Sequence, residues 1–233
     1  MNNTTNEAVL AARGLRKAFG RTEALRGVSL EVAAGETVAV TGRSGSGKST
    51  LLLCLAGVLR PEAGEVTYGG RPLDALSEAE RTRLRRRDIG LVLQFGQLVP
   101  ELSAVDNVAL PLLLDRHDRA ASRRSALGWL DRLGALDLAD ATPGELSGGE
   151  AQRVAVARAL VTGPKVVFAD EPTGALDTVS GEQVLDALLS SAREAGAAVV
   201  LVTHDNRVAA HADREVVVTD GLIEDAGSFA VNR

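Results

Sequence analysis

The chain has 233 residues, 45% of them apolar and 3% aromatic, and its 26 basic and 31 acidic side chains give a net charge of −5. This length predicts one medium-sized domain or two small ones, with a core large enough to need no disulfide bond or structural metal. Cys54 is the single cysteine, so an internal disulfide bond is excluded. The mild acidity argues against a sequence-independent nucleic-acid binder, which would carry a basic stripe.

The start of the chain is polar and lacks the basic and apolar stretches of a secretory signal. The sequence also lacks an apolar run of about 18 residues or more, the length that a membrane-spanning helix needs. We therefore expect a soluble protein of a reducing compartment that does not itself insert into a membrane.

Strand signals come first along the chain. Apolar and polar residues alternate in residues 9–19 and 25–32, on either side of Gly20, which is typical of an antiparallel sheet with one solvent-facing side. Three later β-branched runs predict strands buried on both faces, as in a parallel sheet. These runs are Thr37–Thr41, Val166–Ala169 and Ala197–Thr203. Good helix formers follow each run and predict the α/β class, at Ser49–Leu59, Ser180–Ala195 and Arg207–Ala212.

The middle of the chain, from Pro100 to Leu160, has a helical pattern and no strand-like run. One apolar helix face within it is formed by Ala126, Trp129, Leu130 and Leu133, and Gly134 closes that helix. We expect a helical subdomain inserted into the α/β core. Near the other end, Asp220-Gly221 between two apolar runs predicts a hairpin with a tight turn.

A glycine-rich segment lies between the strand Thr37–Thr41 and the helix that follows it. Residues 42–49 read GRSGSGKS, the pattern of a phosphate-binding loop, in the strand-to-helix context that this loop requires. Glycines let successive backbone N–H groups point at phosphate oxygens, and the helix adds the positive end of its dipole. Lys48 would balance charge on the β- and γ-phosphates, and the Ser49 hydroxyl would ligate Mg²⁺. The alternative is a glycine-rich turn that matches by accident.

Two adjacent carboxylates follow the strand Val166–Ala169. In a nucleotide site, Asp170 would hold Mg²⁺ through water, and Glu171 would orient and deprotonate the water that attacks the γ-phosphate. Acidic residues after a strand indicate, by themselves, only a solvated loop. The phosphate loop upstream favours the functional interpretation.

The sequence LSGGE at residues 146–150 leads into another helical run. Ser147 and Glu150 form a capping-box pattern, which by itself only stabilises a helix start, and Ser77 and Glu80 repeat that pattern. The pair Gly148-Gly149 is the difference, because glycine costs helix stability unless the backbone must approach something closely. Its N–H groups, Ser147 and the helix dipole together predict a second anion site.

On these residues the chain resembles the nucleotide-binding subunit of an ATP-binding-cassette (ABC) transporter. LSGGE matches the signature of that family, and the resemblance runs from about Leu10 to Asp225. It implies a P-loop NTPase fold, with a RecA-like parallel-sheet core, an N-terminal antiparallel β subdomain and an inserted α-helical subdomain. The implied organisation is one ATP-binding domain over residues 1–233, with the core at 1–95 and 160–233 and the helical subdomain at about 96–159.

The resemblance also implies roles for individual residues, with ATP and Mg²⁺ as ligands. Phe19 matches the aromatic residue that stacks on adenine, although a strand-end core aromatic is the alternative. Gln94 matches the glutamine that completes the Mg²⁺ shell and senses the γ-phosphate, on a loop that contacts the membrane partner. His204 matches the switch histidine that contacts the γ-phosphate, and residues 175–177 match the loop that contacts the opposite subunit.

The implied catalytic residues are Lys48, Glu171 and His204, and the implied metal ligands are Ser49, Gln94 and Asp170. The implied nucleotide-binding residues are Phe19, Gly42, Arg43, Ser44, Gly45, Ser46, Gly47, Lys48, Ser49, Thr50, Gln94, Ser147, Gly148 and Gly149. Two positions depart from the common family pattern, Arg43 where proline is usual and Glu150 where glutamine is commoner. Neither departure removes a phosphate donor, so we expect a competent hydrolase.

Family architecture implies two partners for this chain. A second ATP-binding subunit, a homodimer in the simplest case, would place Ser147, Gly148 and Gly149 of one copy against the γ-phosphate bound to Lys48 of the other. A separate membrane permease subunit would receive the stroke, with the helical segment as its docking surface. This arrangement implies a cytoplasmic location, peripheral on the inner face of the membrane, and no nucleic-acid partner.

Residues 98–112 resemble the branch of the family that serves macrolide export, lipoprotein release and antimicrobial-peptide resistance. We therefore expect an exporter or a lipid, lipoprotein or drug extrusion system. A soluble ABC ATPase acting on chromosomes, DNA breaks or ribosomes is a rival, although only 99 positions separate Lys48 from Ser147, too few for a coiled-coil arm. A module that relays force to a cell-wall enzyme stays open. The basic side chains between Arg81 and Arg87 could face acidic lipid headgroups or simply form a solvated helix face.

Overall fold

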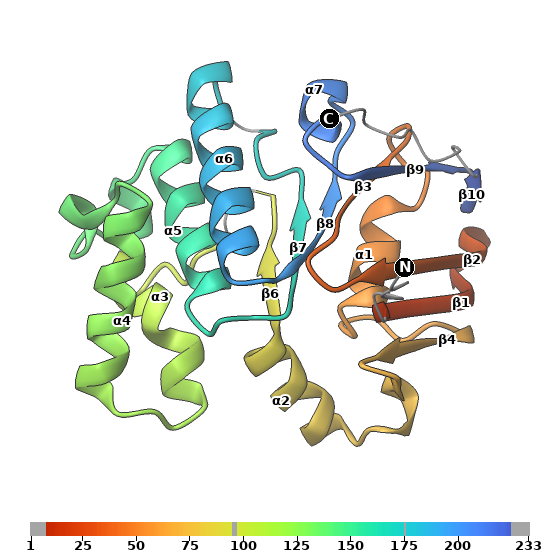
Figure 1. Ribbon diagram of the computed structural model, residues 1–233, viewed down its shortest axis with the longest axis horizontal. Helices are drawn as coiled ribbons and strands as arrows, with labels where there is room; N and C mark the ends of the chain where they lie inside the picture. The colour runs from red at the N-terminus through yellow and green to blue at the C-terminus, as the bar shows by residue number, and fades with distance from the viewer. Residues whose placement is uncertain (1–7, 95–96, 175, 225–233) are drawn as a thin grey trace, which may run out of the picture. The chain divides into compact units, whose positions relative to one another are not determined.

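The computed structural model describes residues 8–94, 97–174 and 176–224 (Figure 1). Its contacts divide the chain into two compact units. Unit one comprises residues 1–82 and 196–233, and unit two comprises residues 83–195. Among the described residues, no helix is long and apolar enough to cross a membrane.

Unit one contains an antiparallel sheet of strand order β2-β1-β4-β5. These strands are β1 (Ala8–Phe19), β2 (Thr22–Ala33), β4 (Ala63–Tyr68) and β5 (Arg71–Pro72). Gly20, at φ 61°, supplies the left-handed turn that lets Phe19 pair with Thr22 across the β1–β2 hairpin. The expected antiparallel layer is therefore present, with β4 as an additional strand.

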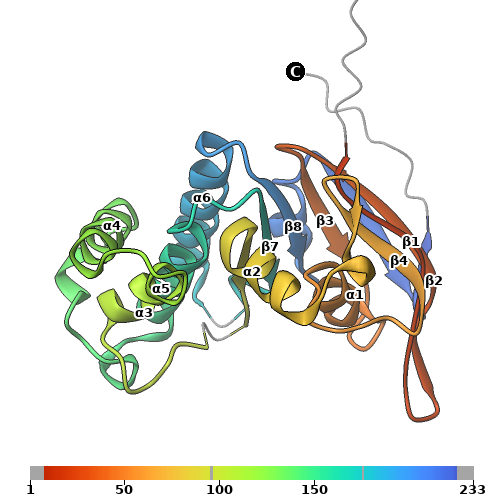
Figure 2. The same cartoon turned by 90° about the horizontal axis from the view of Figure 1, so that it is seen from below.

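Parallel strands form the second layer of unit one. Strand β3 (Thr37–Thr41) pairs in parallel with both β8 (Ala198–Val202) and β9 (Arg214–Thr219), and β9 forms a hairpin with β10 (Leu222–Glu224). Every residue of β3 and β8 is buried, which explains their unbroken runs of β-branched and apolar residues. Helix α1 (Lys48–Leu55) contacts β1 and β2 on one side and β8 on the other, as Figure 2 shows.

Three shorter or more polar elements complete unit one. They are the 3₁₀ turn η1 (Leu73–Ala75), the four-residue helix α7 (Asn206–Ala209) and the start of α2 (Glu78–Asp88), which continues into unit two. Helix α2 has no buried side chain, in keeping with its five arginines. The capping box predicted at its start is present, since Ser77 N–H and its hydroxyl both donate to the Glu80 carboxylate, at 2.8 and 2.7 Å.

Unit two combines a pair of parallel strands with a group of helices. Strand β6 (Ile89–Val92) pairs with β7 (Val166–Asp170). The helices are α3 (Ala104–Leu114), α4 (Arg119–Arg132), α5 (Gly148–Leu160) and α6 (Thr178–Glu194), with 3₁₀ turns η2 (Leu136–Leu138) and η3 (Pro143–Glu145). Helices α3, α4 and α5 pack against one another (Figure 2), and α5 also packs on β6 and α6. Fully buried side chains at their interfaces include Leu130, Leu160, Phe168, Leu185 and Leu188.

The predicted elements are confirmed in type, with differences at their ends. Helix α1 ends at Leu55, four residues before the predicted end. Helix α7 spans Asn206–Ala209, where a helix over Arg207–Ala212 was predicted. Both ends are loops rich in small residues, where propensity gives a weak boundary. The helical character of Pro100–Leu160 is confirmed, since the structure has no strand in that segment, all of which it describes. Strand β4 was not predicted.

Candidate functional site

The loop of residues 42–49 runs from the end of β3 to the start of α1, as its sequence predicts. Gly42, Gly45 and Gly47 have φ values of 139°, 79° and 108°, in the region that glycine adopts without strain. A Cβ at Gly42 would collide with the Val218 carbonyl oxygen, and one at Gly47 with that of Ala24. Two of these glycines are therefore needed both for their conformation and for close backbone packing.

Lys48 is folded back across this loop. Its Nζ donates to the carbonyl oxygens of Gly42 at 2.7 Å and Arg43 at 2.9 Å, and only 8% of the residue is exposed. A buried ammonium needs such partners, because an unpaired buried charge is costly. The loop thus holds its cation at the place where a phosphate group would compete for it.

The start of α1 is open for an anion. Its N-cap is Gly47, which offers no side-chain cap, so the helix presents N–H groups and the positive end of its dipole. The buried Ser46 Oγ has no hydrogen-bond partner among the described residues. A cavity of about 300 Å³ adjoins it, lined by residues 43–46 and 218–220. An orphaned hydroxyl and glycines that leave no room for a Cβ together fit a phosphate chain.

Phe19 and His204 lie on elements that border this loop in unit one. Phe19 is 52% exposed, and Lys17 Nζ lies 5.6 Å from the centroid of its ring. Its hairpin approaches the loop, because Arg26 N–H donates to the Gly221 carbonyl at 2.8 Å and Gly221 N–H donates to the Ser46 carbonyl at 3.0 Å. An aromatic ring this exposed does not serve as a core residue, so the alternative interpretation of Phe19 is wrong.

His204 is an exposed residue two positions after β8, which pairs directly with β3. Thr203 N–H donates to the Val40 carbonyl at 3.1 Å, so the segment before His204 and the phosphate loop leave the sheet at the same edge. The carboxyl edge of parallel strands is the usual ligand position in α/β folds. The Arg207 side chain holds the pKa of the neighbouring Asp205 at about 2, which keeps a carboxylate beside the histidine.

Unit two brings Gln94 and the acidic pair together. Strands β6 and β7 are parallel with Val92 opposite Ala169, so Gln94 and Asp170 follow the same edge. A Cβ placed on Gly174 would lie 3.5 Å from Glu171 Cβ and 3.8 Å from Gln94 Nε2, which shows how near both side chains lie to that glycine.

Glu171 has a left-handed backbone, at φ 46°. A non-glycine residue held there stores strain, and such residues gather at functional sites. The carbonyl of Glu171 accepts from Gly174 N–H at 3.1 Å, which fixes the turn after the acidic pair. This strain supports a role for Glu171 beyond that of a solvated loop residue.

The segment LSGGE forms the start of α5. Ser147 is the N-cap, and its N–H and its hydroxyl both donate to the Glu150 carboxylate at 2.7 Å. These bonds hold the pKa of Glu150 below its usual range. A Cβ on Gly149 would lie 3.6 Å from Ser180 Cβ and 3.7 Å from Leu176 Cδ2, so an alanine there would have ordinary contacts. Packing within unit two therefore does not require glycine at position 149, which favours an approach by something outside it.

The comparisons with known proteins agree with this geometry. The ABC transporter family model matches residues 25–174. This chain belongs to the ABC transporter family. A lipoprotein-releasing system ATP-binding protein, LolD, of Bordetella pertussis is 46% identical over 226 residues, covering 95% of this chain and 97% of the relative. A second, LolD 2 of Rhodopirellula baltica, is 43% identical over 236 residues, covering 97% and 92%.

Among solved structures, the ATP-binding cassette MJ0796, a dimer in a post-hydrolysis state bound to ADP and Pi, is similar with a TM-score of 0.86 and 38% identity. The match covers 92% of this chain and 96% of that one. The P-loop NTPase fold is therefore confirmed. The chain is an ABC cassette that binds nucleotide and hydrolyses ATP.

The predicted site residues of this ABC cassette fall into two sets. Unit one carries Phe19, residues 42–50 and His204, and unit two carries Gln94, residues 147–149, Asp170 and Glu171. Of the predicted loop at residues 175–177, Ala175 lies outside the described residues. Asp177 caps α6 by accepting from Ser180 N–H at 3.0 Å.

The predicted basic cluster on α2 is engaged with the chain's own acids. Arg81 pairs with Glu78 at 2.6 Å, and Arg87 pairs with Asp115 at 2.6 Å. Arg86 pairs with the same aspartate at 3.8 Å and also donates to the Leu114 carbonyl. These pairs favour the solvated helix face over a face reserved for lipid headgroups.

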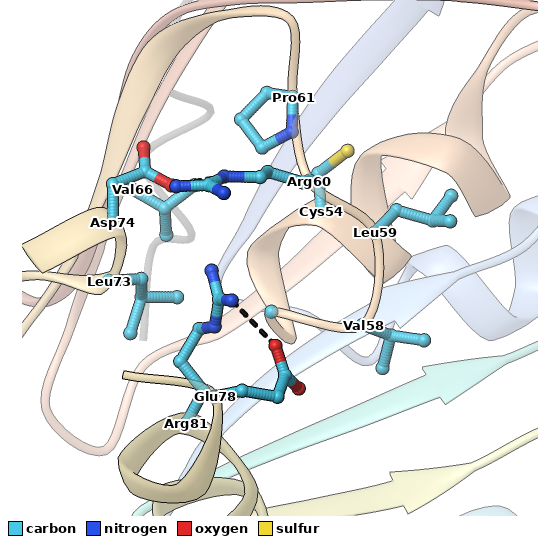
Figure 3. Close-up of a pocket in the computed structure, with 11 residues that line it drawn as sticks. Cys54, Val58, Leu59, Arg60, Pro61, Val66, Leu73, Asp74, Glu78 and Arg81 are labelled. Atoms are coloured by element: carbon cyan, nitrogen blue, oxygen red, sulfur yellow. Dashed lines mark hydrogen bonds and ion pairs between the residues drawn. The ribbon is translucent and has the colours of Figure 1, made fainter. Parts of the chain in front are cut away.

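A second cavity in unit one was not predicted. It has a volume of about 280 Å³ between the end of α1, strand β4 and the start of α2 (Figure 3). Apolar side chains such as Leu59 and Leu73 line it, and two ion pairs flank it, Arg60 with Asp74 at 3.4 Å and Arg81 with Glu78 at 2.6 Å. No residue predicted for the nucleotide site lines it.

Proposed function

We propose that this chain is the ATP-hydrolysing subunit of an ABC transporter that drives lipoprotein release through a separate membrane permease. The observation that carries the proposal is the phosphate loop, where a buried Lys48 ammonium and an orphaned Ser46 hydroxyl face an uncapped helix start. Curated relatives named as lipoprotein-releasing ATP-binding proteins, similar over nearly their whole length, supply the substrate class.

ATP binding begins with an exchange of partners at Lys48. The ammonium leaves the carbonyls of Gly42 and Arg43 and pairs with the β- and γ-phosphates, which also receive N–H groups of residues 43–50. Ser46 gains a hydrogen bond that it lacks among the described residues. Phe19 stacks on adenine, because its exposed ring is at the end of the hairpin beside this loop.

The donor set of Ser49, Gln94 and Asp170 suits Mg²⁺, which takes one or two carboxylates, phosphate oxygens and water. Within the described part of the chain, no group of three His, Cys, Asp or Glu side chains forms a dedicated metal site. When bound, Mg²⁺ supplies charge that stabilises the transferring phosphoryl group.

Glu171 then orients the attacking water and accepts its proton, and the strained backbone at φ 46° fixes the direction of its carboxylate. His204 contacts the γ-phosphate from the carboxyl edge of β8. Lys48 stabilises negative charge as the β–γ bond breaks.

Two copies of the chain close on two ATP molecules in this account. Residues 147–149 of one copy donate N–H groups and the Ser147 hydroxyl to the γ-phosphate in the other, as the family resemblance implies. The similar cassette MJ0796 is a dimer. Closure and opening of this pair drive the permease. The proposed location of the chain is therefore the cytoplasmic face of the membrane, bound to the permease. The rival of a soluble or signalling ABC ATPase is not favoured, because the relatives belong to a lipoprotein-releasing transporter.

A capture experiment tests the proposal. Tagged Glu171→Gln protein, which should bind ATP without turning it over, is incubated with ATP and detergent-solubilised membranes, and Lys48→Ala protein serves as the non-binding control. We expect a polytopic membrane protein in near-equal amount with the Glu171→Gln protein alone. Recovery of only soluble protein, ribosomes or DNA would contradict the permease partner.

A further inference from the structure

The ammonium group of Lys17 lies over one face of the Phe19 ring. The two residues are on β1, two positions apart, and Lys17 Nζ is 5.6 Å from the ring centroid, within the range in which a cation and an aromatic face attract each other. The Lys17 side chain is 19% exposed, whereas Phe19 is 52% exposed. Lys17 therefore covers the ring from the protein side and leaves the other face open.

Contacts in unit one hold this ammonium group in place. Lys17 Nζ lies 3.6 Å from Glu62 Oε1, and Glu62 N–H donates to the Arg16 carbonyl at 2.8 Å, which fixes the glutamate beside β1. Burial raises the pKa of the Cys54 thiol to about 11, and the charge of Lys17 opposes that rise, which places the ammonium near α1 as well. The cation behind the ring is thus held between β1, α1 and the residue before β4.

An ion pair with Glu62 would by itself be an ordinary surface contact, of little effect on stability. The position over the ring adds a second consequence. Aromatic faces carry negative charge, so two rings stacked face to face repel each other electrostatically. A cation on one face draws electron density toward itself and leaves the opposite face less negative. The open face of Phe19 is therefore a better surface for a nucleobase than that of an isolated phenyl ring.

We infer that Lys17 is a positioning residue for the adenine base, which it serves by orienting and polarising the Phe19 ring. The inference rests on the proposed function, in which Phe19 stacks on adenine. Lys17 and Lys48 then have different tasks, because Lys48 lies within the phosphate loop and bonds to its carbonyls. Lys17 contributes to affinity through the base and Lys48 through the phosphates.

Variants of Lys17 separate the charge from the packing of the side chain. Lys17→Met keeps an unbranched apolar stem and removes the charge, and Lys17→Arg keeps the charge on a group that also stacks on aromatic faces. Arg13→Met is the matched control, because Arg13 is another cation of β1 that pairs with a glutamate, Glu31 at 3.8 Å. It lies six positions before Phe19, about 20 Å along the strand. The full chain is used in every case.

Calorimetric titration with ADP and Mg²⁺ measures nucleotide affinity without hydrolysis. Inorganic pyrophosphate, which has no base, is titrated in competition with ADP. We expect Lys17→Met to bind ADP about two- to five-fold more weakly and pyrophosphate with unchanged affinity, which also shows that the phosphate loop is intact. Lys17→Arg should recover most of the loss, and Arg13→Met should match the unchanged protein. Unchanged ADP affinity in Lys17→Met, or equal weakening of ADP and pyrophosphate, overturns the inference.

A cycle with Phe19→Ala tests whether Lys17 acts through the ring. Phe19→Ala should weaken ADP binding about five-fold or more, because a stacking surface is lost. In that background, Lys17→Met should cost nothing further, and full multiplication of the two losses overturns the inference. Failure of the proposed function is a different result, since Phe19→Ala protein that binds ADP as tightly as the unchanged protein would contradict the stacking itself, and the inference with it.

Discussion

Asn107 offers a quantitative test of how the segment after the Gln94 loop is held. Its side chain is fully buried and makes four hydrogen bonds with the backbone. It accepts from Val99 N–H at 2.8 Å and donates to the carbonyls of Val99, Leu102 and Ser103 at 3.0, 3.1 and 3.1 Å. One side chain thus satisfies the turn that leads into α3.

The stability lost on removing the Asn107 side chain depends on which of these backbone groups keep another hydrogen-bond partner. The Val99 carbonyl also accepts from Leu102 N–H at 3.2 Å, and the Ser103 carbonyl from Asn107 N–H at 2.8 Å. Within the described segments, Val99 N–H and the Leu102 carbonyl have only the Asn107 side chain as a partner. Leaving these two part-buried polar groups unpaired, at about 1–2 kcal/mol each, predicts a loss of about 2–4 kcal/mol in the free energy of unfolding for Asn107→Ala.

Urea unfolding followed by circular dichroism measures this loss. Asn107→Leu is the matched variant, because leucine fills about the same volume without hydrogen bonds and should be destabilised to a similar extent. Asn206→Ala, at an exposed asparagine, should stay within about 0.5 kcal/mol of the unchanged protein. Recovery of full stability in Asn107→Leu would refute the reasoning, since packing and not hydrogen bonding would then explain the asparagine.

Two further predictions concern ionisable groups. Burial raises the pKa of the Cys54 thiol to about 11, so labelling by a thiol reagent at pH 8 should be slow in the folded chain and fast in urea, and equal rates would contradict the burial. The carboxylates of Glu145, Glu150 and Asp177 have folded-state pKa values below the ordinary range because neighbouring hydroxyl and N–H groups donate to them, so their contribution is complete above about pH 5 and is lost as pH falls through the lowered values. Urea midpoints should therefore fall below about pH 4, and less steeply in Glu150→Gln; an identical slope would contradict the capping-box account.

The sequence predicted those elements whose residues all lie in the same kind of environment or form a local pattern. Strands β3, β7 and β8 were recognised because burial on both faces leaves unbroken apolar runs, and the start of α5 because its capping box is local. Strand β4 was missed because its first residues are exposed and Gly64 lies within it, where a Cβ would collide with backbone of β1. The need for glycine at position 64 comes from contact with β1, about fifty positions earlier in the chain.

Contacts between distant segments account for what the sequence did not show at the site. Lys17 lies in what looks like an ordinary alternating strand, and its ion pair with Glu62 depends on the pairing of β1 with β4. Asn107 had one available signal, a polar residue inside an apolar helical run. The strained backbone of Glu171 has no sequence signal, because φ is set by the turn that Gly174 closes.

The measurement that tests the central claim most directly is ATP-dependent association of the Glu171→Gln protein. Light scattering coupled to size-exclusion chromatography should give the mass of two chains in the presence of ATP and Mg²⁺. Without nucleotide it should give the mass of one chain. The same protein should release almost no phosphate, while the unchanged protein hydrolyses ATP. A Glu171→Gln protein that stays monomeric with saturating ATP, or that hydrolyses ATP at the unchanged rate, would contradict an ABC cassette that works as a pair with Glu171 as its base.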